Sequence, residues 1–224
     1  MSVLPSNSLS TPYRRLRAYL DMLFVDHGIF RVVWTARHEI APGVYRSNQP
    51  LPFQLAALAR RGVKTVINLR GARLCGSYAF EIDACAAHGM TLVDFPVNSR
   101  DVPKRETIAQ AKALFERIEY PMLFHCKSGA DRAGLFSVLY LVLHENQDVE
   151  NAMRRHLSLR FGHFRQAKTG LLDFFFETYL AYAKVHPIDF YTWSQTVYDP
   201  AAVKAGFMTQ WWANLIVDKL LGRE

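Results

Sequence analysis

The chain has 224 residues and a formal net charge of +7 at pH 7, and half of its residues are hydrophobic. This composition is sufficient for one hydrophobic core of ordinary size and does not indicate a second one. The positive charge indicates an anionic partner, but the basic residues are scattered and form no recognisable nucleic-acid-binding module, so no nucleic acid is expected as a partner. The three cysteines, at positions 75, 85 and 126, lack metal-binding spacing, and their odd number argues against a disulfide scaffold. We therefore expect a reducing compartment and neither a metal nor another cofactor.

The N-terminal segment is expected to precede the main domain. Residues 1–12 are polar, lack the apolar core of an export signal and are expected to form a disordered arm. Residues 13–40 begin with apolar side chains at helical spacing beside several arginines, which predicts an amphipathic helix and a lead-in. No apolar run in the sequence is long enough and free enough of charge to span a bilayer. We expect a cytoplasmic protein, and contact with the inner membrane surface is left open.

Residues 41–185 are expected to form the main domain, because short apolar runs alternate there with helical periods. We expect strands near residues 43–46, 64–69, 91–95 and 121–125, and helices near residues 52–61, 77–88, 104–119, 131–145, 148–160 and 170–184. This alternation indicates an α/β fold, with a mixed, mostly parallel central sheet of four to five strands and helices on both faces.

Residues 186–224 are expected to form a C-terminal helical extension. An irregular aromatic stretch is followed by a terminal segment whose apolar residues share one helical face. These residues are Met208, Trp211, Trp212, Leu215 and Ile216. We favour packing of this face and of the N-terminal helix on the domain, and binding to a membrane surface or a partner is the alternative.

The segment HCKSGADRAG, residues 125–134, joins a predicted strand to a predicted helix. At such a junction, free backbone N–H groups can converge on one anion, with the positive end of the helix dipole behind them. Gly129 permits the tight turn of this loop, and the planar guanidinium of Arg132 can hold two phosphate oxygens. Cys126 lies where these positive groups favour its thiolate, the nucleophilic form, and His125 is expected to support it. The predicted phosphate-binding residues are Lys127, Ser128, Gly129, Ala130, Asp131 and Arg132.

This loop resembles the His-Cys-five residues-Arg signature of the cysteine-dependent protein tyrosine and dual-specificity phosphatases. The segments GVYRSNQP (residues 43–50) and VINLRG (residues 66–71) are similar to the early strands of the compact atypical members of this superfamily, found in bacteria and fungi, so the resemblance covers about residues 40–180. It implies a dual-specificity-phosphatase-like fold and attack by Cys126 on a phosphomonoester. A cysteinyl-phosphate would then be hydrolysed by water without a metal.

One position departs from this pattern. The family usually carries Ser or Thr after the arginine, and its hydroxyl helps the thiolate leave when the phosphoenzyme breaks down. This chain has Ala133. We therefore expect slow breakdown of the phosphoenzyme and a burst of product before the steady state.

The general acid is less clearly marked in the sequence than the nucleophile. The family usually supplies an aspartate from a loop before the helix that precedes the catalytic strand, which favours Asp101; however, an aspartate before a proline and a helix is also a common capping pattern. Asp131 inside the loop is one alternative, and Asp94, in a predicted strand, is more typical of a structural residue. Arg46 and Arg70 end predicted strands of the same sheet as Cys126 and are interpreted as supporting residues that add positive charge near the loop, or else as ordinary surface charge.

The substrate class is left open by the sequence. The resemblance favours a phosphorylated protein, whereas Lys127 directly after the cysteine is similar to relatives that hydrolyse phospholipids, phosphoinositides or, as a further option, lipid A. A phosphate-binding adaptor without turnover is the remaining alternative, although an adaptor has no use for Cys126. Cys75 is either a redox partner of Cys126 or, as we favour, a buried small hydrophobic residue.

Overall fold

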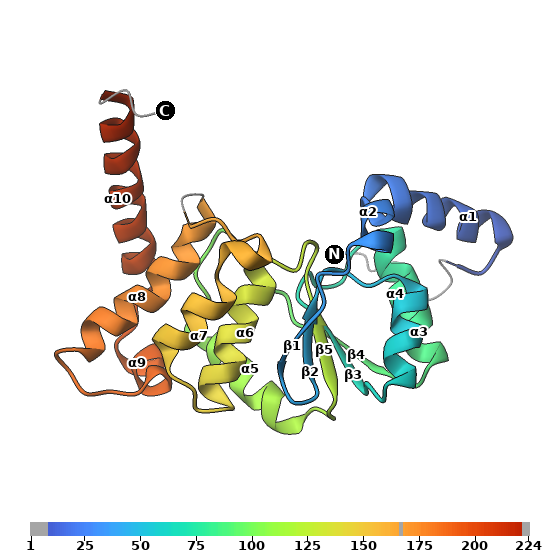
Figure 1. Ribbon diagram of the computed structural model, residues 1–224, viewed down its shortest axis with the longest axis horizontal. Helices are drawn as coiled ribbons and strands as arrows, with labels where there is room; N and C mark the ends of the chain where they lie inside the picture. Colours follow the sequence, from blue (N-terminus) through green and yellow to red (C-terminus); the bar gives the residue numbers. More distant parts are fainter. Residues whose placement is uncertain (1–8, 166–167, 221–224) are drawn as a thin grey trace. The chain divides into compact units, whose positions relative to one another are not determined.

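The computed structural model describes residues 9–165 and 168–220, without the side chains of residues 210 and 212–220. The chain divides into two units, and each is described by itself below. The first unit consists of residues 1–97 and 117–137, and the second of residues 98–116 and 138–224. Figure 1 labels the helices and strands in chain order.

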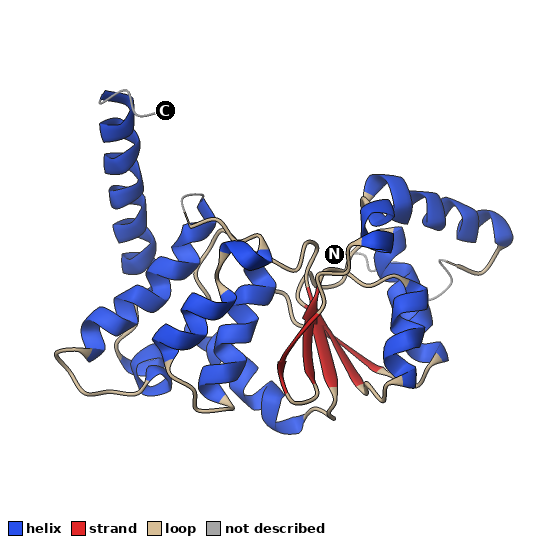
Figure 2. Cartoon of the chain, in the orientation of Figure 1, coloured by secondary structure: helices blue, strands red, loops and turns tan. Residues whose placement is uncertain are grey.

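The first unit is built on a five-stranded sheet, drawn in red in Figure 2. The strands are β1 (His38–Ala41), β2 (Val44–Ser47), β3 (Thr65–Asn68), β4 (Thr91–Asp94) and β5 (Met122–His125). Their order is β1-β2-β5-β3-β4, and only the β1–β2 pair is antiparallel. In the register, His125 pairs with both Ser47 and Asn68, so the central parallel strands end at one level. The loop after His125 therefore starts at the carboxyl edge of the sheet, where α/β proteins commonly bind ligands.

Helices cover both faces of this sheet. The helices of the first unit are α1 (Pro12–Leu20), α2 (Gly28–Val33), α3 (Pro52–Arg60), α4 (Gly76–Ala87) and the beginning of α6 (Asp131–Leu143). On one face, α3 and α4 pack on Val66 and Leu123, which are fully buried. On the other face, the ring of Phe124 contacts Phe136 of α6 at a centroid distance of 5.1 Å. The alternation of Leu123 and Phe124 along β5 explains why a continuous apolar run forms a strand that is buried on both sides.

The second unit is helical. It contains α5 (Arg105–Arg117) up to residue 116, the remainder of α6, α7 (Val149–His156), α8 (Leu171–Ala183), α9 (Phe190–Thr196) and α10 (Pro200–Leu220). An aromatic cluster holds α8 and α9 together, with Phe175 and Trp193 5.9 Å apart between ring centroids. Arg105 donates hydrogen bonds to the carbonyls of Gln195 and Tyr198, which ties α9 to the start of α5. Thus the segment after residue 186 shares its packing with α5 and α8.

The structure agrees with most of the predicted elements and differs at several points. The predicted helix 148–160 ends at His156, where the hydroxyl of Ser158 donates to the carbonyl of Arg155 and replaces the next helical hydrogen bond. The stretch predicted to be irregular contains helix α9, which Asp189 caps through the N–H of Thr192. Strand β1 was not predicted, because four residues at a sheet edge carry no clear alternation.

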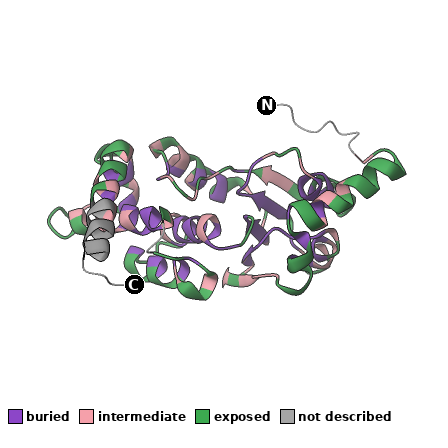
Figure 3. Ribbon diagram, turned by 90° about the horizontal axis from the view of Figure 1, so that it is seen from above, coloured by how far each residue is buried: buried purple, intermediate pink, exposed green. Residues whose placement is uncertain are grey.

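The N-terminal helix packs only partly as expected. The amphipathic helix predicted at the start of residues 13–40 consists of α1 followed by a wider π-helical turn, Asp21–Val25, and it begins at Pro12, inside the predicted disordered arm. Residues 1–8 of that arm lie outside the described residues. Helix α1 packs on α4 through Ala18 and Tyr19 but leaves Leu16 and Leu20 exposed, so the expected packing of its apolar face is confirmed only in part. Figure 3 shows this helix, next to the grey N-terminal trace, mostly in the colour of exposed residues.

The C-terminal helix α10 is partly packed, with Val203 and Phe207 buried against the second unit and Met208 and Trp211 half-buried. The predicted face continues through Trp212, Leu215 and Ile216, whose side chains lie outside the described residues. Within the described ranges, no helix is both long enough and apolar enough to cross a membrane.

Candidate functional site

The loop from Cys126 to Ala130 connects β5 to α6 and turns around the cysteine sulfur. Cys126 is buried, with 2% of its surface exposed. Its Sγ accepts a hydrogen bond from the backbone N–H of Gly129 at 3.2 Å. The N–H of Gly134 donates to the carbonyl of Ala130 at 2.7 Å and closes the first turn of α6. The sulfur therefore lies at the start of a helix, where free N–H groups and the helix dipole favour negative charge.

Position 129 requires glycine. Its φ is +80°, a conformation that other residues rarely adopt, and a Cβ there would lie 2.8 Å from the backbone N of Asn48 and 2.9 Å from the backbone C of Ser47. The backbone of the loop at Gly129 is thus in direct contact with the backbone of the segment at the end of β2 and just after it. Gln49 reinforces this contact by donating its N–H to the carbonyl of Lys127 at 3.4 Å.

Arg46, on strand β2, binds the backbone of the loop. Its side chain is fully buried, and Nη2 donates to the carbonyls of Gly129 at 2.7 Å and Ala130 at 3.1 Å. Burial lowers the pKa of Arg46 to about 10, and the opposing charges of Cys126 and Asp131 limit the decrease. An arginine that binds these two carbonyls keeps them turned toward itself, which favours N–H groups of the loop that face the opposite way, toward an anion.

A buried ionic network adjoins the loop, and its centre, Asp26, was not predicted. The carboxylate of Asp26 accepts two hydrogen bonds from Arg70, at 2.7 and 2.8 Å, and one each from Arg31 at 3.1 Å and Ser77 at 2.7 Å. Burial opposes ionisation of this carboxyl, but the hydrogen bonds from Arg70 and Ser77 and the charges of both arginines hold its pKa well below the ordinary value. The ammonium Nζ of Lys127 lies 3.5 Å from Asp26, so the network reaches the loop directly.

His125 has a second set of buried polar neighbours. Its Nε2 lies 2.5 Å from Oε1 of Glu81, and both side chains are completely buried. The other carboxylate oxygen of Glu81 accepts from Gln49 at 2.9 Å, and the amide oxygen of Gln49 accepts a short hydrogen bond from Arg70. Glu81 and Gln49 were not assigned roles from the sequence, although Gln49 belongs to the segment that resembles the family. His125 and Arg70 are thus joined through two side chains that come from α4 and the end of β2.

The three candidate acids have different surroundings. Asp131 is the first residue of α6 and lies in the same unit as Cys126. Asp94 accepts hydrogen bonds from Asn68 at 2.8 Å and from the hydroxyl of Tyr78, contacts that join β4 to β3 and α4 as expected for a structural residue. Asp101 belongs to the second unit, where it forms an ion pair with Lys204 at 3.1 Å.

The remaining predicted positions are also located. Arg132 is half-buried in the first turn of α6, and Ala133 beside it is fully buried. Cys75 immediately precedes α4, and it is a free thiol, as are Cys85 and Cys126. Burial raises the pKa of Cys75, which disfavours its thiolate. Within the described ranges, no group of histidine, cysteine and carboxylate side chains could hold a metal ion.

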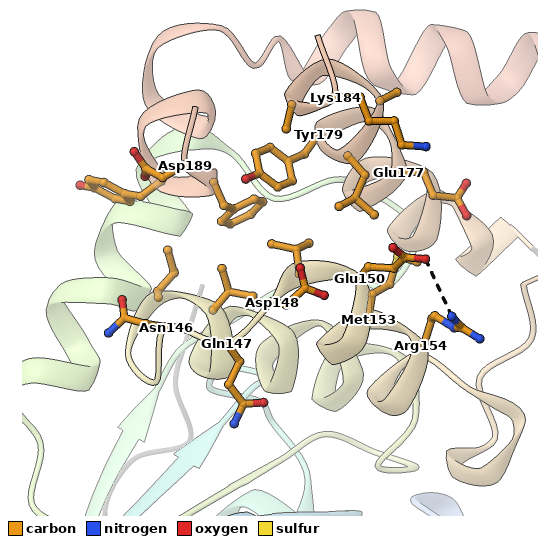
Figure 4. Close-up of a pocket in the computed structure, with 18 of the residues that line it drawn as sticks. Asn146, Gln147, Asp148, Glu150, Met153, Arg154, Glu177, Tyr179, Lys184 and Asp189 are labelled. Atoms are coloured by element: carbon orange, nitrogen blue, oxygen red, sulfur yellow. Dashed lines mark ion pairs between the residues drawn. The ribbon is translucent and has the colours of Figure 1, made fainter. Parts of the chain in front are cut away.

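The second unit contains a separate cavity, shown in Figure 4. Its volume is about 1030 Å³, and it is lined mainly by residues of α7, α8 and α9 together with the loop before α7. Charged side chains of both signs line it, and Glu150 and Arg154 lie 3.8 Å apart as an ion pair. None of the site residues predicted from the sequence lines this cavity.

The chain is similar to known phosphatases. The family described as "DSP-PTPase phosphatase fused to NAD+ Kinase" matches residues 34–170, which include the whole loop around Cys126. The dual specificity protein phosphatase TpbA of Pseudomonas aeruginosa is 29% identical in one strain and 28% in another, over 130 residues that make up 56% of this chain and 55% of TpbA. The chain thus spans about half the length of the curated relatives it matches.

A crystal structure of P. aeruginosa TpbA matches the fold with a TM-score of 0.50 and 19% identity, over 77% of this chain and 90% of that chain. This match agrees with the dual-specificity-phosphatase-like α/β fold expected from the sequence. Because the family match extends over more than half of the residues of this chain, the chain belongs to the DSP-PTPase family.

Proposed function

We propose that this protein hydrolyses phosphomonoesters through a cysteinyl-phosphate intermediate. The observation that carries the proposal is the position of the Cys126 sulfur, which accepts the N–H of Gly129 just before α6, with Arg132 in the first turn of that helix. These groups form a site for a dianionic phosphate directly above a nucleophile.

The proposed reaction has two steps. In the first, the Cys126 thiolate attacks phosphorus, the S–P bond forms, and the P–O bond to the leaving group breaks as that oxygen takes a proton from the general acid. In the second, water attacks phosphorus and gives a proton to the now deprotonated general acid, the S–P bond breaks, inorganic phosphate forms and the thiolate is restored. Arg132 and the loop N–H groups hold the phosphate oxygens in both steps, and they are most effective where charge develops on those oxygens. Arg46 acts by holding the loop in this shape.

The general acid is proposed to be Asp101, with Asp131 as the alternative. The order of elements supports Asp101, because it lies in the loop before α5, the helix that precedes β5. Its ion pair with Lys204 would have to open for it to donate a proton. Asp131 is supported by its position at the end of the catalytic loop itself.

The proposed substrate is a phosphorylated protein, supported by the name of the TpbA relatives, dual specificity protein phosphatases. A phospholipid or related lipid phosphate is the second candidate, and the exposed apolar and basic side chains of α1 and α2 favour it. A cytoplasmic location is proposed because the three cysteines are odd in number and are all free thiols, which supports a reducing compartment.

Phosphate release from three substrates tests this function. A phosphotyrosine peptide, a phosphothreonine peptide and phospholipid vesicles are each incubated with the wild type, with Cys126→Ser and with Cys75→Ser as a matched control. We expect release by the wild type and by Cys75→Ser, and none above background by Cys126→Ser. Preference for vesicles would select the lipid alternative. Binding of phosphate without release from any substrate would indicate the non-catalytic adaptor.

A further inference from the structure

The N-terminal helices expose an unusual number of large hydrophobic side chains. Eleven of the eighteen large hydrophobic side chains that are exposed in the described part of the chain lie between residues 13 and 34. We call them the N-terminal apolar surface: Tyr13, Leu16, Tyr19, Leu20, Phe24, Val25, Ile29, Phe30, Val32, Val33 and Trp34. Large exposed hydrophobic side chains concentrated in one segment mark an interaction site more often than isolated exposed residues do.

Helix α1 contacts α4 through Ala18, Arg15 and the ring of Tyr19, which lies edge-on to Phe80 at a centroid distance of 6.1 Å, whereas its leucines stay exposed. The carbonyl of Ala18 lies so close to Gly76 that a Cβ at position 76 would be 1.9 Å from it, which places the Ala18 side of α1 against α4. Arg15 pairs with Asp83 of α4 at 3.1 Å on the same side of the contact. Leu16 and Leu20, four residues apart and therefore on one face, are 58% and 46% exposed.

Helix α2 likewise turns a charged residue toward the protein and apolar residues toward the solvent. It buries Gly28 and Arg31, and Arg31 is held by Asp26, whereas Phe30, Val33 and the following Trp34 are 71%, 90% and 69% exposed. A helix that packed normally on a domain would turn its apolar side inward. The buried salt bridge therefore fixes α2 with its apolar side outward.

The charges of the same segment select an anionic partner. Helix α1 carries no acidic residue, and besides Arg15, which pairs with Asp83, it has exposed arginines at positions 14 and 17. Exposed leucine, phenylalanine and tryptophan side chains beside arginines are typical of helices that lie in the interface of an anionic bilayer. We propose that residues 12–34 bind the surface of an anionic lipid bilayer, with the N-terminal apolar surface in the headgroup region.

This docking would position the catalytic loop relative to the membrane. Asp26, between α1 and α2, binds Arg70 and lies 3.5 Å from Nζ of Lys127, so one ionic network connects the docking segment to the loop. The consequence for catalysis, faster hydrolysis of phosphate groups at a lipid surface, rests on the proposed phosphatase function. The binding itself does not rest on it and is measured separately.

The test is flotation of the full chain with vesicles. One set of vesicles contains phosphatidylcholine alone, and the other contains phosphatidylcholine and phosphatidylglycerol in equal amounts. The double variant Phe30→Ser/Val33→Ser removes two exposed side chains of the surface, and Phe53→Ser, at a position that is 57% exposed on α3, is the matched control. Surface substitutions of this kind change folding stability little, and circular dichroism confirms that each variant is folded.

We expect the wild type and Phe53→Ser to float with the phosphatidylglycerol vesicles, and the double variant to bind about tenfold more weakly or worse. Arg14→Gln/Arg17→Gln should weaken binding to these vesicles and have no effect on the neutral ones. Quenching of tryptophan fluorescence by brominated lipid should fall in Trp34→Phe. The proposal is overturned if the wild type does not float, if Phe53→Ser fails equally, or if the double variant instead dissociates a dimer of this chain in sedimentation.

Discussion

Replacing Asp26 by Asn should destabilise the first unit strongly. The carboxylate is 7% exposed and receives hydrogen bonds from two buried arginines and from Ser77. Asn removes the negative charge, so the buried guanidinium groups of Arg31 and Arg70 lose the carboxylate that neutralises them. Removing one partner of a buried charge pair costs about 3–5 kcal/mol, a large part of the 5–15 kcal/mol that stabilises a typical domain.

Urea denaturation followed by circular dichroism measures this loss at neutral pH. The matched control is Asp83→Asn, which removes an exposed partner of Arg15 in the same unit. Because that pair is about half-exposed to solvent, its loss should cost less than about 1 kcal/mol. Equal effects of the two substitutions would refute the role assigned to the buried network.

The contribution of Asp26 should also depend on pH in one direction. Its pKa is lowered in the folded state, so the unfolded chain binds the proton more readily, and the stabilisation is fully present above the ordinary aspartate value of about 4. The stabilisation is lost as the pH falls from that value toward the folded pKa. The difference in unfolding free energy between the wild type and Asp26→Asn should therefore shrink below pH 4, and a constant difference would contradict the assigned ionisation.

Three further predictions concern catalysis. Gly129→Ala should lower kcat/KM by about 100-fold, because the new Cβ would displace the loop from Asn48, and steady-state kinetics measures this change. The wild type should show a burst of product in a rapid-mix assay, and Ala133→Ser should raise the steady-state rate. Asp101→Asn and Asp131→Asn are compared in pH–rate profiles, and only the variant that has lost the general acid should lose the basic limb of its profile. Its loss of activity should be smallest with substrates that have good leaving groups, because these need little protonation.

Each of these three predictions can be contradicted by a specific result. Gly62→Ala is the control for Gly129, since Gly62 also has positive φ (+86°) but has open space around it, and an equal loss of activity there would exclude the steric explanation. Absence of a burst together with no gain from Ala133→Ser would exclude slow breakdown of the phosphoenzyme. Unchanged basic limbs in both aspartate variants would exclude both candidates.

Much of the fold could be predicted because local pattern and tertiary environment agree. The apolar run ending at His125 forms β5, and the long apolar run after Gly134 forms α6, since both segments are buried on all sides and are bounded by a loop with glycine. The nucleophile and Arg132 could be proposed for the same reason: their spacing across a strand–helix junction is itself a local pattern.

The ionic network could not be predicted, because its partners are distant in sequence. Asp26 and Arg70 are 44 positions apart, and no spacing rule connects them. The outward face of α1 was also missed. Periodicity shows that a helix has an apolar face, but it does not show whether that face meets the protein or the solvent. Here Gly76 and Asp83 select the opposite face for contact.

The central claim, covalent catalysis by Cys126, is tested most directly by trapping the intermediate. The enzyme is mixed rapidly with a phosphotyrosine peptide, quenched in acid within the burst and digested, and the peptides are identified by mass spectrometry. We predict phosphate on the peptide that contains Cys126, and none in Cys126→Ser. Release of phosphate without any phosphorylated Cys126 peptide, or with phosphate on another residue, would contradict the account.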